Sequence, residues 1–274
     1  MNPNLVFQLF ALMFGLCIGS FLNVCIARMP HDKSVVSPGS ACPSCMTPIR
    51  AWDNIPVVSW LLLRAQCRNC KVSISALYPI IELLMGLLAL LLFRLMVPDI
   101  QQVTHYSLGI WCSTTAFVAM LVGLSFIDIR WKMIPDQFSI WAIPFGIGAA
   151  FALQHLDGSA PFIGPTPKEA IIGAVAGIGS LLLIIGSYWL IRREEGMGMG
   201  DVKLLGMIGA FLGWQALAPV ILMASVSGSI IGIGLMIAQG RGFRSQLPFG
   251  PFLSLGAVAY LFFWPHIQDS LLIG

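Results

Sequence analysis

Uncharged, largely apolar stretches alternate with short charged segments along this chain of 274 residues. A hydrocarbon core about 30 Å thick is crossed by about 20 residues of apolar helix. Stretches without Asp, Glu, Lys or Arg that reach this length are 1–27, 100–127, 137–156, 170–191, 204–240 and 245–268. A further candidate, 78–97, contains only two charged residues, Glu82 and Arg94.

The stretch 204–240 would measure about 55 Å as a single helix, nearly twice the thickness of the core. We therefore expect it to cross the membrane twice, with a turn near Gly213-Trp214-Gln215. The pattern predicts an all-α polytopic membrane protein with about eight transmembrane helices. Runs of small residues, such as 173–177 and 228–234, are interpreted as close helix packing in lipid rather than as binding loops.

The composition excludes a soluble globular protein. Hydrophobic residues make up 57% of the chain and charged residues 10%, whereas a soluble domain has roughly 25% charged residues. Disorder is also excluded, because 17 Phe and 8 Trp are a large apolar load for a chain that does not bury it. The net charge of +3 does not indicate a nucleic acid partner. The composition instead predicts contact with a lipid bilayer, and it leaves the oligomeric state open.

The basic residues predict the orientation in the membrane. No Lys or Arg precedes Arg28, so 1–27 is interpreted as a retained transmembrane helix rather than a cleaved signal peptide. If this helix ends in the cytoplasm and the spans alternate, 13 of the 15 basic residues lie on the cytoplasmic side, and only Arg94 and Lys168 do not. The positive-inside rule therefore predicts that both termini are external.

One hydrophilic segment, 28–77, is long enough to form a small cytoplasmic domain. It divides the chain into a first transmembrane helix (1–27), this insert and a transmembrane core (78–274). The insert contains Cys42-Pro43-Ser44-Cys45 and Cys67-Arg68-Asn69-Cys70, two C-x-x-C pairs with about 20 residues between them. Four thiolates fill all the positions of a tetrahedral ion, so the spacing predicts a structural zinc site that supplies folding free energy to the insert.

Disulfide bonds are the alternative for these four cysteines. The predicted cytoplasmic location is reducing, which favours zinc. The remaining cysteines, Cys17, Cys25 and Cys112, lie in predicted spans and are interpreted as small buried residues. His31 is interpreted as a surface residue, because four thiolates already complete the site.

Two acidic residues lie next to the ends of predicted spans on the cytoplasmic side. Asp128 follows the stretch 100–127, and Asp201 lies beyond the stretch 170–191. Ionisable residues against a bundle interior are costly and are functional candidates by default. Two carboxylates that meet there would share a proton. The charged one can take a proton from water while the neutral one hydrogen-bonds the carbonyl under attack, which is the chemistry of aspartyl proteolysis.

The alternative is that Asp128 and Asp136 cap a helix and that Asp201 opens the next one. For each residue taken alone, this is the better interpretation. The run Gly196-x-Gly198-x-Gly200 also suggests a nucleotide loop. Its spacing is not G-x-G-x-x-G, however, and no predicted strand precedes it. We expect these glycines to give a mobile, close-packed backbone that lets a peptide reach Asp201.

At this level of detail the motifs resemble a known family. Gly198-Met199-Gly200-Asp201 is similar to the G-x-G-D signature of intramembrane aspartyl proteases, the class that includes presenilin. Over residues 15–256 the chain is similar to the bacterial type IV prepilin peptidases. The segments that carry this similarity are 19–24, the two cysteine pairs, 52–60, 78–82, Asp128 with 134–136, 200–203 and 248–252.

The resemblance implies a bifunctional enzyme of the bacterial inner membrane. Such enzymes remove the leader peptide of type IV prepilins or type II secretion pseudopilins at the cytoplasmic face. They then methylate the new N-terminal amine with S-adenosylmethionine. The resemblance implies that Asp128 and Asp201 are the catalytic pair, supported by further residues of the same motifs: Asp136, Lys203, Gly198 and Gly200.

The methyltransferase function is associated in this family with the insert 28–77 and the segment that follows it. The sequence contains no recognisable cofactor loop. Glu82 and Gly86 are the candidate residues for binding S-adenosylmethionine.

Two other classes of protein are considered. A transporter would also be polytopic and rich in glycine, but its polar site should lie near the middle of the bilayer, where only Glu82 and Arg94 interrupt a span. A zinc-bearing membrane adaptor would explain the insert without catalysis, and Asp128 and Asp201 would then be replaceable.

Overall fold

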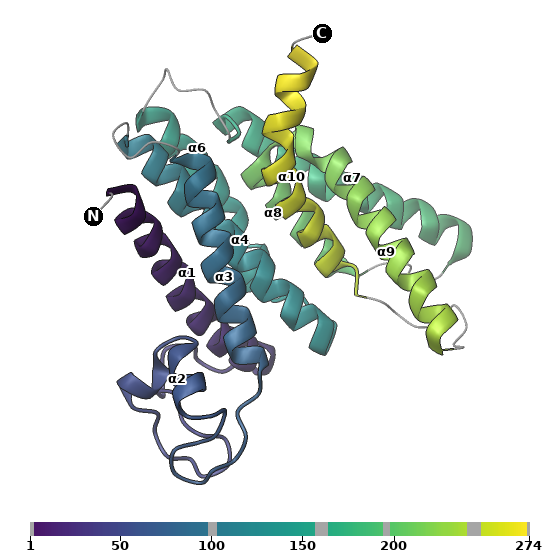
Figure 1. Cartoon of the computed structure of the whole chain (residues 1–274). Helices are drawn as coiled ribbons and strands as arrows, with labels where there is room; N and C mark the ends of the chain where they lie inside the picture. The colour runs from purple at the N-terminus through teal and green to yellow at the C-terminus, as the bar shows by residue number, and fades with distance from the viewer. Residues whose placement is uncertain (1–2, 98–102, 157–163, 194–197, 240–247, 273–274) are drawn as a thin grey trace. The chain divides into compact units, whose positions relative to one another are not determined.

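The computed structural model describes residues 3–97, 103–156, 164–193, 198–239 and 248–272, with the side chains of the last helix described as far as Phe263. Helices of fourteen or more residues dominate this part of the chain (Figure 1). They are α1 (Pro3–Arg28), α3 (Leu77–Met96), α4 (His105–Trp131), α6 (Ala142–Leu156), α7 (Pro167–Arg192), α8 (Met199–Leu212), α9 (Leu217–Gln239) and α10 (Gly250–Leu272). The expected all-α class is confirmed.

The long helices occupy the places of the eight predicted spans. Six helical segments among the described residues are long and apolar enough to cross a membrane, so the protein is a multi-pass membrane protein. The apolar parts of the other two helices are shorter than a membrane crossing requires. Helix α8 has 14 residues, about 21 Å, and the apolar part described for α10 is Gly250–Phe263. The count of eight crossings stays a prediction.

The expected turn inside 204–240 is confirmed. Helix α8 ends at Leu212, and Gly213 follows with a φ of 80°, a backbone conformation that favours glycine. A 3-10 turn at Trp214–Ala216 then leads into α9. One long apolar stretch therefore forms two helices because a single glycine reverses the chain.

The chain forms two compact units, 1–119 and 120–274, and α4 runs from the first into the second. In the first unit, α1 and α3 lie side by side (Figure 1). A Cβ atom on Gly15 would be 2.5 Å from the carbonyl oxygen of Met85, and one on Gly19 would be 2.6 Å from Cα of Glu82. The two glycines are four residues apart, and they permit this close approach of the helices as small residues do in lipid. In the same unit Cys25 is buried as expected, whereas Cys17 and Cys112 are exposed on their helices.

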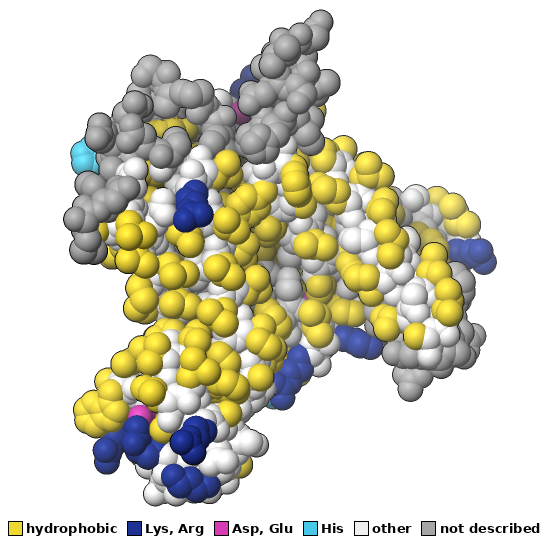
Figure 2. All heavy atoms as spheres, viewed as in Figure 1, with side chains coloured by type: hydrophobic (Ala, Val, Ile, Leu, Met, Phe, Trp, Pro, Cys, Tyr) yellow, Lys and Arg dark blue, Asp and Glu magenta, His cyan; other side chains and the backbone are white. Residues whose placement is uncertain are grey.

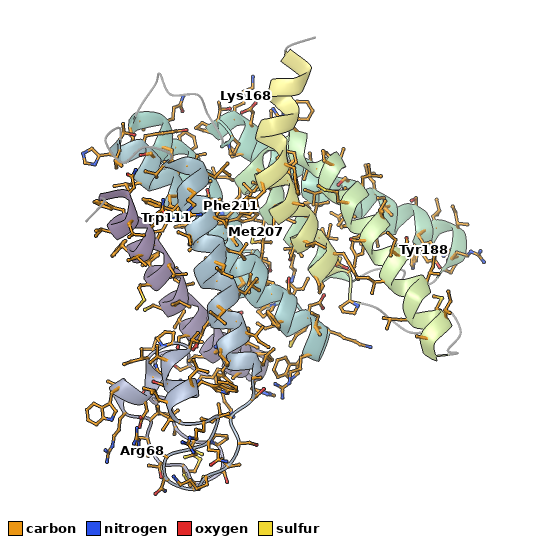
Figure 3. The ribbon with its side chains drawn as sticks, viewed as in Figure 1. Arg68, Trp111, Lys168, Tyr188, Met207 and Phe211 are labelled. Atoms are coloured by element: carbon orange, nitrogen blue, oxygen red, sulfur yellow. The ribbon has the colours of Figure 1, made fainter. Side chains whose placement is uncertain are left out.

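The second unit is built around α8. Every residue from Leu204 to Phe211 is buried, and the side chains of Met207 and Phe211 are labelled on this helix in Figure 3. Helices α6, α7, α9 and α10 all contact α8. A helix enclosed on all sides needs no polar face, which explains why the sequence of 204–211 is apolar throughout.

Glycines bring α7 against α8. Gly173 faces Gly209, and a Cβ on Gly177 would be 2.5 Å from the carbonyl oxygen of Leu205. A Cβ on Gly179, two residues further along α7, would have no atom within 4 Å. The expectation that the glycines of 173–177 serve close packing is confirmed. It is wrong for 228–234, where a Cβ on Gly228 would make only ordinary contacts and one on Gly234 would have no atom within 4 Å, because these positions face away from close neighbours.

We expect Gly177→Ala to lower the free energy of unfolding by about 1–3 kcal/mol, because its new methyl group would overlap backbone atoms that cannot move aside. Gly179→Ala is the matched control on the same helix and should leave stability unchanged or slightly raise it. Thermal unfolding in detergent measures both. Equal effects of the two substitutions would contradict close packing of α7 on α8.

Candidate functional site

Asp128 lies near the end of α4 and is buried. Its Oδ2 atom accepts a hydrogen bond from the backbone N–H of Gly250, at 3.2 Å. Gly250 is the first residue of α10, and the first N–H groups of a helix have no partner within the helix and favour negative charge. The start of α10 thus supplies Asp128 with a hydrogen-bond donor from a residue 122 positions away.

Asp201 lies in the first turn of α8 and is also buried. The charge of Asp128 acts on Asp201, so the two carboxylates are close enough to interact electrostatically. The N-cap of α8 is Gly198, and Asp128 lies inside α4 rather than at its N-terminus. Helix capping therefore does not explain Asp128, whereas Asp201 opens α8, as the alternative interpretation also expected.

Ile134 packs between two glycines beside this pair. A Cβ atom on Gly200 would be 3.0 Å from Cβ of Ile134, and one on Gly250 would be 3.3 Å from Cδ1 of Ile134. A Cβ on Gly250 would also be 2.6 Å from Oδ2 of Asp128. Gly200 and Gly250 are thus required by close approach, and they bring α8 and the start of α10 to the end of α4.

Asp136 and Lys203 pair with each other. Asp136 begins the short helix α5 (Asp136–Ser139), and its Oδ1 lies 2.6 Å from Nζ of Lys203 on α8. Both side chains are partly exposed. Gly198, the N-cap of α8, has extended backbone. Gly196 lies outside the described residues.

The four cysteines of the insert form a cluster that could hold a metal ion. The Sγ atoms of Cys42, Cys45, Cys67 and Cys70 all lie within 4.8 Å of one another. Hydrogen bonding with Thr47 lowers the pKa of Cys45 to about 6, and cysteines bind a metal ion as thiolates. The structure confirms that the two C-x-x-C pairs converge.

Each cysteine pair belongs to the same type of turn, a repeat that the spacing of the cysteines alone did not reveal. In the first turn, Cys42 receives a hydrogen bond at its carbonyl from the N–H of Met46 and donates its own N–H to Thr47. In the second, Cys67 does the same with Lys71 and Val72. The φ angles of Met46 and Lys71 are both positive, at 56° and 62°. The insert therefore presents two equivalent metal-binding turns.

The two candidate residues for the methyl donor lie in the first unit. Glu82 is buried on α3, and its Oε2 atom accepts the backbone N–H of Val57, at 2.7 Å. A Cβ on Gly86 would be 2.9 Å from the side chain of Leu16 on α1. The structure thus places Glu82 where the insert meets α3 and Gly86 one turn further along, in the contact between α1 and α3.

Comparison with known proteins assigns the chain to a family. Residues 13–96 match the bacterial peptidase A24 N-terminal domain, and residues 115–233 match the type IV leader peptidase family. A protein of Aeromonas salmonicida named prepilin leader peptidase/N-methyltransferase is 36% identical over 94% of this chain and 91% of its own length. The chain belongs to the type IV leader peptidase family.

Other members of the type IV leader peptidase family carry the same name. The protein of Myxococcus xanthus is 39% identical over 86% of this chain and 65% of its own length. That of Neisseria gonorrhoeae is 37% identical over 89% of this chain and 86% of its own. No solved structure matches the chain.

The two matched segments contain different site residues. The N-terminal match contains the four cysteines, and the second match contains Asp128 and Asp201. Gly250 lies beyond residue 233, outside both. Gly250 belongs to the motif Pro248-Phe249-Gly250-Pro251-Phe252, which carries part of the family resemblance but had no role assigned to it from the sequence.

We expect the purified protein to hold one metal ion in the cysteine cluster. Replacing one ligand, as in Cys67→Ser, should lower the bound metal to near zero and destabilise the insert, because removing a thiolate leaves the ion incompletely coordinated. Cys17→Ser, on α1, is the control and should retain the metal. Elemental analysis of the purified proteins measures this, and a metal-free parent protein would refute the site.

Proposed function

We propose that this chain is a membrane-embedded aspartyl endopeptidase that removes the leader peptide of type IV prepilins or type II secretion pseudopilins. We further propose that it N-methylates the new N-terminal residue with S-adenosylmethionine. The observation that carries the proposal is the pair of buried, electrostatically interacting carboxylates Asp128 and Asp201. The relatives named prepilin leader peptidase/N-methyltransferase support the choice of substrate.

The two carboxylates have different surroundings, and this assigns their roles in the proposed reaction. Asp128 accepts the N–H of Gly250, and a hydrogen bond to a carboxylate stabilises its charged form. Asp128 is therefore the charged member of the pair and Asp201 the protonated one. Asp128 takes a proton from the attacking water, while Asp201 donates its proton to the oxygen of the scissile carbonyl.

The resulting tetrahedral intermediate has two hydroxyl groups on the former carbonyl carbon. In the second step, Asp128 returns its proton to the leaving nitrogen and Asp201 regains a proton from one hydroxyl. The carbon–nitrogen bond then breaks. Both carboxyl groups end in their starting states, and one water molecule has been consumed.

The basic residues next to the pair support an active site at the cytoplasmic face. Arg130 and Lys132 follow Asp128, and Lys203 follows Asp201. Under the positive-inside rule these residues mark the cytoplasmic ends of α4 and α8. A pilin-like substrate with its apolar segment in the inner membrane and its leader in the cytoplasm would then present the scissile bond at this depth. In this orientation both termini are periplasmic.

Asp136 and Lys203 act as supporting residues in this proposal. Their ion pair joins α5 to the first turns of α8, two residues from Asp201. Gly200 has no side chain, so that Ile134 can pack against the start of α8, and Gly198 is the N-cap of this helix. These contacts fix the height of Asp201 relative to Asp128.

We propose zinc as the metal of the cysteine cluster. Four thiolates are a donor set typical of structural zinc, and they leave no open position for catalysis. The ion would hold the two turns of the insert 28–77 together. We assign the methyltransferase activity to the insert and the start of α3. Residues 78–274 form the protease core, and 1–27 is the first transmembrane helix.

S-adenosylmethionine would supply the methyl group for the new N-terminal amine. Glu82 and Gly86 stay the candidate residues for this activity. Their contacts support an indirect role for both, because Glu82 holds Val57 of the insert and Gly86 admits Leu16 of α1.

Asp128→Asn and Asp201→Asn should each lower cleavage of a prepilin in detergent by about 10³-fold or more, because each removes one half of a pair that acts as a unit. Asp53→Asn, which changes a carboxylate of the insert, is the matched control and should retain cleavage. Size-exclusion chromatography verifies that every variant is folded. Normal cleavage by either variant of the pair would favour the zinc-bearing adaptor instead.

Gly250→Ala should lower kcat by about 10²-fold, because the new methyl group would displace the carboxylate of Asp128 and a misplacement of about 1 Å has effects of that size. Gly228→Ala, on α9, is the control, since its new Cβ would make only ordinary contacts with Phe252. Cleavage kinetics on a prepilin peptide compare the two. An unchanged kcat in Gly250→Ala would remove Gly250 from the site.

A further inference from the structure

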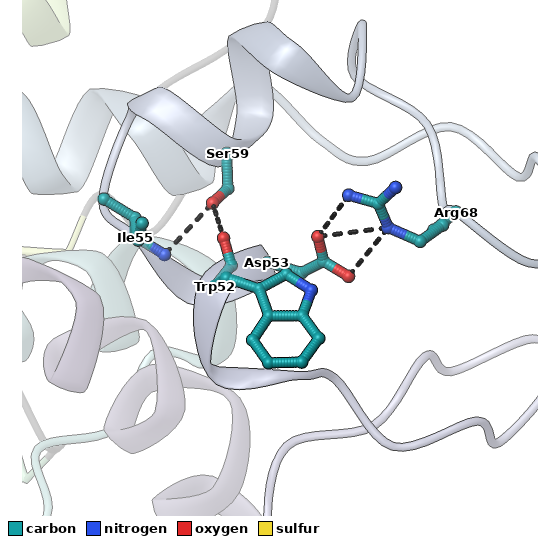
Figure 4. Close-up of polar contacts among 5 residues, drawn as sticks. All are labelled: Trp52, Asp53, Ile55, Ser59 and Arg68. Carbon is teal, nitrogen blue, oxygen red and sulfur yellow. Dashed lines mark hydrogen bonds and ion pairs between the residues drawn. The ribbon is translucent and has the colours of Figure 1, made fainter.

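The short helix α2 (Val58–Leu62) of the insert turns its apolar side chains outward. Ser59 is 6% exposed, whereas Leu61 is 61% and Leu62 78% exposed. The hydroxyl of Ser59 donates to the carbonyl of Trp52 at 2.9 Å and accepts the N–H of Ile55 at 3.1 Å (Figure 4). The indole N–H of Trp60 likewise bonds inward, to the carbonyl of Ile74. These bonds fix the direction in which the two leucines point.

The outward side chains form one apolar surface, which we name the α2 surface: Trp52, Val58, Leu61 and Leu62. Trp52 is 62% exposed. This arrangement is the reverse of that in a soluble domain, which gains stability by burying leucines and exposing serines. An exposed cluster of this kind indicates contact with a partner or with a membrane.

The α2 surface lies at the level of the spanning helices of the same unit. Val57, the N-cap of α2, donates its N–H to the carboxylate of Glu82 at 2.7 Å. Glu82 lies in the second turn of α3, about 8 Å from its start. Asn23 of α1 bonds the carbonyl of Tyr78 in the first turn of α3, at 3.1 Å. The start of α2 therefore lies beside the helical parts of α1 and α3 rather than beyond their ends.

Charge favours a membrane as the partner of the α2 surface. The insert 28–77 has six basic and two acidic residues, whereas the rest of the chain has nine basic and ten acidic ones. Arg50 and Arg64 flank the α2 surface, and the guanidinium of Arg50 lies 5.6 Å from the ring centre of Trp52. Arg68, by contrast, is paired with Asp53 (Figure 4). Figure 2 shows hydrophobic side chains of the insert next to Lys and Arg side chains.

We propose that the α2 surface is a membrane anchor that rests on anionic phospholipid. Its apolar side chains enter the boundary between headgroups and acyl chains, and Arg50 and Arg64 contact the lipid phosphates. An apolar face flanked by basic residues binds a bilayer surface in this way. The anchor holds the insert against the leaflet from which α1 and α3 emerge. It does not depend on the proposed catalytic activity.

Photo-crosslinking of the full-length protein tests the anchor. Leu62 is replaced by p-benzoylphenylalanine, and in a second protein Met46 is replaced as the control, since it is an exposed apolar residue of a metal-binding turn. Both proteins are irradiated in nanodiscs of phosphatidylethanolamine and phosphatidylglycerol, and mass spectrometry counts phospholipid adducts. We expect about tenfold more lipid adduct at position 62 than at position 46, because only the first should reach the acyl chains.

Charge reversal tests the contribution of the lipid phosphates. In the protein crosslinked at position 62, Arg50→Glu together with Arg64→Glu should lower the ratio of phosphatidylglycerol to phosphatidylethanolamine adducts about fivefold or more. An unchanged ratio would overturn the role of the two arginines. Equal lipid adducts at positions 62 and 46, or crosslinks from position 62 to a protein in native membranes, would overturn the anchor itself.

Discussion

A carboxylate taken out of water must be neutralised or given hydrogen-bond donors, and the second unit of this protein buries two of them together. Asp128 receives a backbone N–H at the start of α10, and Asp201 stands in the first turn of a helix whose next residues are enclosed by four others. Gly200 and Gly250 are needed because any side chain there would meet Ile134 or Asp128 itself. These two glycines let α8 and the start of α10 approach the end of α4, where the two carboxylates lie.

In the first unit, a few polar groups hold the insert in place. A segment with few apolar residues cannot form a core of its own, so the insert is held by four converging thiols and by bonds to the ends of α1 and α3. Glu82 is the central link, because its buried carboxylate accepts the N–H of Val57 at the point where α2 begins. The insert that carries the cysteine cluster and the packed helices α1 and α3 are thereby connected through one side chain.

Much of this could be predicted from the sequence, because the information was local. The uncharged stretches predicted the long helices, and the Gly-Trp-Gln segment in the longest of them predicted the turn after α8. The cysteine spacing gave the metal cluster, since two residues between thiols suffice for one ion. Asp128 and Asp201 could be picked out because charged residues are rare in this chain.

The rest depended on contacts between distant residues. Gly250 lies 122 positions from Asp128, and no periodicity links the two. The orientation of α2 could not be predicted either, because the five residues V-S-W-L-L show no pattern that tells which side is buried. The hydrogen bonds of Ser59 and Trp60 determine it. Glu82 stood out as a charge within a span and as a candidate for binding the methyl donor, but the backbone N–H of Val57 that it accepts carries no sequence signal.

The central claim, that Asp128 and Asp201 together stabilise a tetrahedral intermediate, is tested most directly by binding rather than by turnover. A peptide spanning the leader junction of a prepilin, with a hydroxyethylene group in place of the scissile amide, mimics that intermediate. The parent protein should bind it about 10²-fold or more tightly than the amide peptide, as enzymes bind analogues of their transition states. Asp128→Asn and Asp201→Asn should each lose this preference while still binding the amide peptide. A preference that survives in either variant would contradict the account.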